Sequence, residues 1–173
     1  MTRTLTFSVV MLFLTACATL DTGRNKDSSY MNVMYSGLMF KIPAEPLVVA
    51  FLGGESDILT FEYSKEPGKY IGYTTDHDLT TGGCDPAIFF QKALSGEASK
   101  SDCNGEITSF NQVFSRGRET GTWSGTNQTF YYFISSGKRS SFVFFVSDDG
   151  TIKKMESDFL KKSDFRKSLS NYL

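Results

Sequence analysis

A single histidine lies between two aspartates in the sequence, as Asp76, His77 and Asp78. An imidazole beside carboxylates can act as a general base or help to bind a metal ion. None of the serines lies in a Gly-x-Ser-x-Gly motif that would supply the nucleophile of a hydrolytic triad. These three residues are therefore either a weak catalytic or metal site or a polar loop after the apolar segment 70–75. We favour the loop and expect neither a metal nor another cofactor.

Two of the three cysteines, Cys84 and Cys103, lie 19 residues apart near the middle of the chain. The chain has no Cys-x-x-Cys motif and only one histidine, which argues against a zinc site. The N-terminal sequence described below indicates that the domain is exported, and an even number of cysteines in an exported domain favours a disulfide. The pattern therefore predicts a Cys84–Cys103 disulfide, with two reduced thiols as the alternative.

The third cysteine, Cys17, follows an uncharged and mostly apolar run over residues 5–14, which Arg3 precedes. A run of this length is typical of a signal peptide and is shorter than the ~20 residues that span a membrane as a helix. The run ends Leu14-Thr15-Ala16-Cys17, which resembles the lipobox of prokaryotic lipoproteins. A cysteine buried in an N-terminal core helix is the alternative interpretation.

This resemblance implies that residues 1–16 are removed and that Cys17 is lipidated, so that the protein is anchored to a membrane. The residue after Cys17 is Ala18, whereas an aspartate there is the inner-membrane retention signal of Gram-negative lipoproteins. In a Gram-negative host, the resemblance thus implies an outer-membrane lipoprotein that faces the periplasm.

Three further features have a functional and a structural interpretation. Gly82-Gly83 resembles a loose phosphate cradle but lacks the lysine of a Walker motif, so we favour a turn. We also interpret Gly53-Gly54 as a turn. Trp123 either stacks on a sugar or peptide or belongs to the core, and we favour the core.

Charge is unevenly distributed along a chain whose net charge is only −1. Residues 18–115 carry 7 basic and 13 acidic side chains, whereas residues 116–173 carry 10 basic and 6 acidic ones. The overall balance gives no electrostatic case for nucleic-acid binding. The basic side chains of the C-terminal segment could contact anionic lipid or another polyanion, but a solvated helix face is the simpler interpretation. They are Lys153, Lys154, Lys161, Lys162, Arg166 and Lys167.

Residues 17–29 read as the lipidated cysteine and a flexible tether, because 21–29 contain no apolar side chain. Residues 30–173 have the length of one domain. Short apolar runs between glycines and prolines predict strands at 31–35, 38–42, 47–52, 58–63 and 70–75. A meander of three strands is expected at 129–135, 141–147 and 151–156.

Two helices are expected in the domain. The first begins after a cap at Asp85 and ends at Gly96, with Ile88, Phe89 and Ala93 on its apolar side. The second runs from a cap at Ser163 to residue 172. Residues 106–115 fit either a helix or a strand, and their Thr, Phe and Val content makes us favour a strand.

These elements predict an α+β fold, in which an antiparallel sheet packs against about two helices. Residues 129–135 and 141–147 are apolar on both faces, which requires either cover on both faces or a binding surface on one of them.

Three functions are compatible with this sequence. The first is a non-catalytic, membrane-anchored lipoprotein that binds an envelope protein, peptidoglycan or a small apolar ligand. The second is an envelope hydrolase or metal-dependent enzyme that uses His77 with Asp76 or Asp78. The third is a periplasmic inhibitor or immunity factor. We favour the binding function.

Overall fold

The computed structural model describes residues 29–54, 56–77, 79–96, 103–137 and 139–173. The expected signal peptide, Cys17, Ala18 and nearly all of the tether lie outside these described residues, as does Asp78. The structure therefore bears on the domain that begins near Tyr30.

Seven strands form one antiparallel sheet in the order β3-β4-β5-β9-β8-β7-β6. They are β3 (Val48–Leu52), β4 (Ile58–Glu62), β5 (Tyr70–Thr75), β6 (Arg118–Ser124), β7 (Thr129–Ser135), β8 (Ser141–Val146) and β9 (Ile152–Ser157). A separate hairpin joins β1 (Tyr30–Tyr35) to β2 (Leu38–Pro43). The antiparallel α+β architecture expected from the sequence is confirmed.

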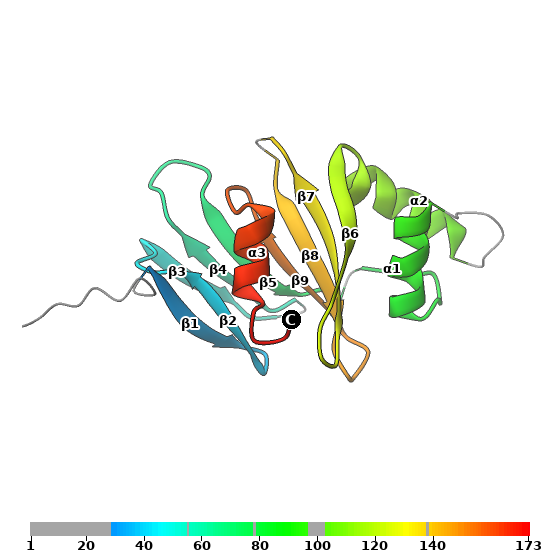
Figure 1. Ribbon diagram of the computed structural model, residues 1–173, viewed down its shortest axis with the longest axis horizontal. Helices are drawn as coiled ribbons and strands as arrows, with labels where there is room; N and C mark the ends of the chain where they lie inside the picture. Colours follow the sequence, from blue (N-terminus) through cyan, green and yellow to red (C-terminus); the bar gives the residue numbers. More distant parts are fainter. Residues whose placement is uncertain (1–28, 55, 78, 97–102, 138) are drawn as a thin grey trace, which may run out of the picture.

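Helices and the hairpin cover the two faces of this sheet (Figure 1). The β1–β2 hairpin and α3 (Lys162–Ser168) lie over one face, which we call the hairpin face. Helices α1 (Pro86–Ser95) and α2 (Asn104–Phe110), with the π-helical turn η1 (Asn111–Ser115), lie over part of the opposite helix face. The molecule thus has three layers, with the large sheet in the middle.

The alternation of side chains along β7 and β8 explains why both faces need cover. Phe130 and Phe145 pack in the core of the hairpin face. Their neighbours Tyr131 and Phe144 pack against α1 and α2 on the helix face. Of the two alternatives, cover on both faces is the one observed, so β7 and β8 present no free binding surface.

Helix α1 is fixed by local signals at both ends. The Asp85 carboxylate accepts hydrogen bonds from the backbone N–H groups of Ala87 and Ile88, at 2.9 and 3.1 Å. Gly96 ends the helix with a left-handed φ of 70°. The expected bounds are confirmed, but Ile88 lies on the exposed side, and Phe90 takes the core position instead.

The expectation of a strand at 106–115 was wrong. These residues form the C-terminal part of α2 and η1, so the described chain has three α-helices rather than about two. Ile107, Phe110 and Phe114 recur at helical spacing and pack into the aromatic cluster below β7 and β8. This packing outweighs the strand preference of the individual residues. Strand β6, which follows, was not anticipated.

The last helix is shorter than expected and begins earlier. Helix α3 ends at Ser168, and its cap is Lys161, whose backbone N–H donates to the Asp164 carboxylate at 3.0 Å. Phe165 and Leu169 face the core, and both are fully buried.

Candidate functional site

The two cysteines of the domain form the expected disulfide. Cys84 lies just before the Asp85 cap of α1 and Cys103 just before α2, and their Cα atoms are 5.9 Å apart. The bridge joins the starts of the two helices that cover the helix face. It is a structural link rather than a reactive thiol pair.

The adjacent glycines belong to the turn that leads into this bridge. Gly82 and Gly83 have φ values of 62° and 80°, and the N–H of Cys84 donates to the carbonyl of Thr81 at 3.1 Å. A side chain at Gly82 would collide with the carboxylate of Glu106. Backbone geometry and close packing therefore account for Gly82, which supports the turn over a phosphate cradle.

The Asp76 carboxylate is occupied by structural contacts at the end of β5. One oxygen accepts a hydrogen bond from the N–H of Leu79 at 3.0 Å, and the other lies 3.7 Å from Nζ of Lys154. His77 is exposed next to it, and Asp78 lies outside the described residues. The described geometry therefore fits a polar loop, and it aligns no nucleophile with His77.

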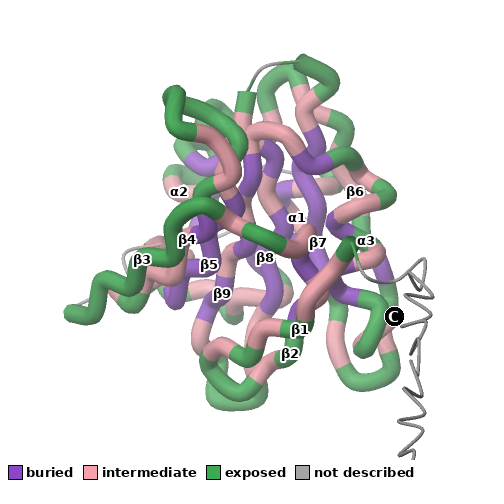
Figure 2. Tube along the Cα trace, turned by 90° about the vertical axis from the view of Figure 1, so that its left-hand side faces the viewer, coloured by how far each residue is buried: buried purple, intermediate pink, exposed green. Residues whose placement is uncertain are grey.

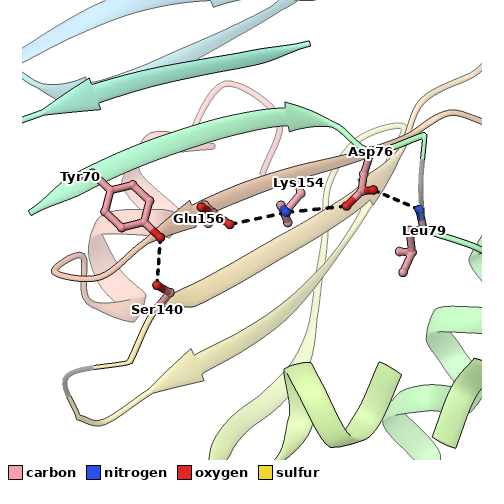
Figure 3. Close-up of polar contacts among 6 residues, drawn as sticks. All are labelled: Tyr70, Asp76, Leu79, Ser140, Lys154 and Glu156. Carbon is pink, nitrogen blue, oxygen red and sulfur yellow. Dashed lines mark hydrogen bonds and ion pairs between the residues drawn. The ribbon is translucent and has the colours of Figure 1, made fainter. Parts of the chain in front are cut away.

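Beyond Lys154, the polar contacts continue across the part of the helix face that α1 and α2 leave uncovered (Figure 3). The ammonium of Lys154 also lies 3.5 Å from the Glu156 carboxylate, so it bridges two acidic groups. At the far end, Tyr70 shares a 3.0 Å hydrogen bond with Ser140, and burial raises the pKa of its phenol. These contacts pair the polar groups of the sheet with one another. The charge of Lys154 is balanced by Asp76 and Glu156, so Lys154 is not a free cation for a ligand.

The part of the chain that the structure describes contains neither a metal-binding cluster nor a helix that could span a membrane. Within it, no three His, Cys, Asp or Glu side chains come close enough to hold a metal ion. Within it, too, every helix is too short or too polar to cross a membrane.

Most lysines of the basic C-terminal segment have partners within the molecule. Lys153 donates to the hydroxyl and carbonyl of Ser36 in the β1–β2 turn, and Lys162 lies 2.6 Å from a Glu119 carboxylate oxygen. Nζ of Lys167 lies 3.6 Å from the ring centre of Tyr30. These contacts hold the hairpin to the sheet and to α3, and α3 to β6 of the sheet, which favours a structural role over a patch for anionic lipid.

Trp123 belongs to the core, as favoured from the sequence. Its side chain is buried, and its ring stacks on Tyr132 with centroids 4.8 Å apart. It therefore offers no platform for a sugar or peptide.

Strand β3 and the residue before it carry five of the nine exposed large apolar side chains among the described residues. The residues of β3 are all exposed, and so is the preceding Leu47 (Figure 2). Phe51 and Leu52 are 62% and 66% exposed, so most of their apolar surface stays in contact with water. We call residues 47–52 the β3 edge, because β3 pairs with β4 on one side and has no neighbouring strand on the other among the described residues.

Local sequence explains how the β3 edge forms. Pro46 precedes it, Gly53 and Gly54 follow it, and the N–H of Leu47 donates to the carbonyl of Glu62 at 2.7 Å. Val48, Ala50 and Leu52 lie on the helix face of the sheet. Val49 and Phe51 lie on the hairpin face, so apolar side chains are exposed on both sides of the strand.

The opposite edge of the sheet is protected in the usual way. Strand β6 carries Arg118 and Glu119, and Lys162 of α3 pairs with Glu119. Charged residues on an edge strand discourage pairing with another chain. The β3 edge lacks such protection, since no charged residue occurs between Pro46 and Gly54.

The sequence predicts β3 as a strand but does not predict that the strand is exposed. A usable signal was present, because apolar residues occupy successive positions rather than alternate ones. That pattern has two explanations, a central strand buried on both faces or an unprotected edge, and only strand order distinguishes them.

Comparison with known proteins adds no relative to this description. No protein-family model matches the chain, and no curated protein or solved structure matches it significantly.

Proposed function

We propose that this chain is a bacterial envelope lipoprotein, anchored by lipid on Cys17, whose folded domain binds another protein chain along the β3 edge. The observation that carries the binding function is the exposure of five large apolar side chains on an unprotected edge strand. These side chains are Leu47, Val48, Val49, Phe51 and Leu52. The lipobox-like sequence at residues 14–17 supports the anchor.

The chemistry of an edge strand favours a protein partner over lipid or a small apolar ligand. Alternate backbone N–H and C=O groups of β3 point away from β4 and need hydrogen-bond partners. Hydrocarbon cannot satisfy those groups, and lipid-exposed sheet edges do not occur within membranes. An added β-strand satisfies the backbone and covers the apolar side chains at the same time.

The function is tested by recovering partners of the lipidated protein from envelope membranes after chemical cross-linking. Val49→Lys with Phe51→Lys places two charges on the β3 edge and leaves the core untouched. Val113→Lys is a matched control, because Val113 is an exposed apolar residue of η1 that is 61% exposed. Any partner that binds through β3, including a second copy, should be recovered with wild type and the control but lost with the double variant.

Equal recovery with all three proteins would overturn the binding function at this strand. Thermal unfolding of the three proteins checks that they are equally folded. We expect similar melting temperatures, since all three substituted side chains are exposed.

A further inference from the structure

The sequence of β3 is complementary to itself in an antiparallel pair. If two copies pair about a two-fold axis at Ala50, Val48 of each lies opposite Leu52 of the other. Val49 then lies opposite Phe51, and the two Ala50 residues face each other. Every cross-strand pair is apolar, and like charges never meet within the strand.

We propose that the partner of the β3 edge is a second copy of this chain, and that the two large sheets join there into one continuous antiparallel sheet. This inference rests on the binding function proposed for the β3 edge. A partner strand with apolar side chains on both faces of the sheet covers the exposed side chains of β3 best, because directly opposite residues of paired strands contact each other. The β3 edge is such a strand.

The position of the N-terminus agrees with this arrangement. Residues opposite each other in an antiparallel pair point to the same face, so the two-fold axis runs perpendicular to the sheet. The hairpin faces of both copies then lie on the same side. The described domain begins with this hairpin at Tyr30, so both copies present their N-terminal ends on that side. Two copies could therefore be anchored in one membrane.

The two edges of the sheet also explain why assembly stops at two copies. A two-fold contact through β3 uses the same strand in both copies, which closes the assembly. The edges that remain are the two β6 strands, where Arg118 and Glu119 discourage further pairing.

The contact between the two strands is small, so we expect it to need the help of a shared membrane to form. One five-residue strand supplies far fewer contacts than the ~20–30 residues that each partner contributes to a stable protein interface. Anchoring two copies in the same membrane raises their effective concentration without adding contacts. We expect a weak dimer in detergent and a larger dimer fraction in the membrane.

Cysteine cross-linking in native membranes tests the register residue by residue. In this arrangement two Ala50 residues have Cα atoms about 4.5–5.5 Å apart, within the range of a disulfide. Two Val48 residues, or two Leu52 residues, are displaced by four positions, about 13 Å. Cys84 and Cys103 are already bonded to each other, and the proposed lipidation removes the thiol of Cys17, so each new cysteine is the reactive one.

We expect Ala50→Cys to give a disulfide-linked dimer under mild oxidation with copper phenanthroline. Val48→Cys alone and Leu52→Cys alone should each give about one-tenth as much or less, because their thiols lie too far apart. The double variant Val48→Cys with Leu52→Cys should cross-link again. The three exposed positions share one strand, so differences in folding or access do not explain this pattern.

Two outcomes would overturn the second copy as partner. Equal cross-linking at all three single positions would indicate random collision, and the absence of cross-linking from both Ala50→Cys and the double variant would exclude this pairing. If another envelope protein were still lost from the Val49→Lys/Phe51→Lys variant, the binding function would stand and its partner would be a different chain. If nothing bound through β3 in either experiment, both proposals would fall.

Discussion

Tyr63 shows how a single side chain links the sheet to the hairpin. Its hydroxyl donates to the carbonyl of Pro43 at the end of β2, at 2.8 Å, and its ring packs edge-on against Phe159 at 5.4 Å. Burial raises the pKa of the Tyr63 phenol to about 12. It also raises the pKa of the more deeply buried Tyr73, which touches the hairpin residue Phe40.

These tyrosines predict a loss of stability in alkaline solution. A phenol in the unfolded chain ionises near pH 10, whereas Tyr63 in the folded chain stays neutral until about pH 12. The stabilisation from its raised pKa is complete below pH 10 and is lost as the pH rises to about 12. Urea unfolding at pH 9 and 11 should show a smaller decrease for Tyr63→Phe than for wild type. An identical decrease in both proteins would contradict this role.

The Cys84–Cys103 disulfide predicts a stability difference that reduction reveals. The bridge closes a loop with a sequence separation of 19, so Cys84→Ala with Cys103→Ala should lower the free energy of unfolding by about 2–4 kcal/mol. The fold should be retained, because both helices keep their apolar contacts. Urea unfolding measures the difference, and reductant should destabilise wild type but not the double variant. Two free thiols in a non-reduced envelope preparation would show that the bridge does not form in the cell.

At the level of elements, α2 is held to the sheet by aromatic packing. Phe110 is 3% exposed, and its ring lies at centroid distances of 4.6–5.6 Å from five others. Those rings belong to α1, η1, β7 and β8, namely Phe89, Phe90, Phe114, Phe133 and Phe144. This one side chain therefore joins most of the layer that covers the helix face.

We expect Phe110→Ala to cost about 3–5 kcal/mol of unfolding free energy, because it leaves a cavity among rings that cannot collapse together. Val113→Ala, three residues away on the exposed side of η1, should change the stability by less than about 0.5 kcal/mol. Chemical denaturation of both variants provides the measurement. Similar costs for the two would mean that 104–115 does not pack as a helix with Phe110 inward.

At the level of the whole molecule, we propose a domain that is anchored to a membrane by lipid and that pairs with another strand through the β3 edge of its sheet. The lipobox-like sequence and the β3 edge are separate features, one outside the described residues and one within them. Membrane attachment and edge pairing can therefore be removed independently.

The anchor predicts a specific change of location. Labelled fatty acid should enter wild type but not Cys17→Ala, which should lose its membrane attachment. In a Gram-negative host, wild type should fractionate with the outer membrane, and Ala18→Asp should move the protein to the inner membrane. A mature protein that still begins at Met1 would contradict the lipobox interpretation.

Local signals in the sequence were enough for several elements. Asp85 and Gly96 set the ends of α1 because a cap and a left-handed terminus depend on neighbouring residues alone. The β7–β8 hairpin and β9 followed from apolar runs and the turns between them. The Cys84–Cys103 pair followed from the number of cysteines left in the domain after Cys17.

Only the tertiary structure decided which strands are central and which are edges. Strand β5 pairs with β9, some 80 residues later in the sequence, and that long-range pairing leaves β3 without a second neighbour. Tertiary packing also decided that residues 106–115 are helical. Burying Phe110 in the aromatic cluster stabilises the helix by more free energy than the strand preference of these residues would contribute. The sequence determined that residues 48–52 form an apolar strand, but long-range pairing determined that this strand is exposed to a partner.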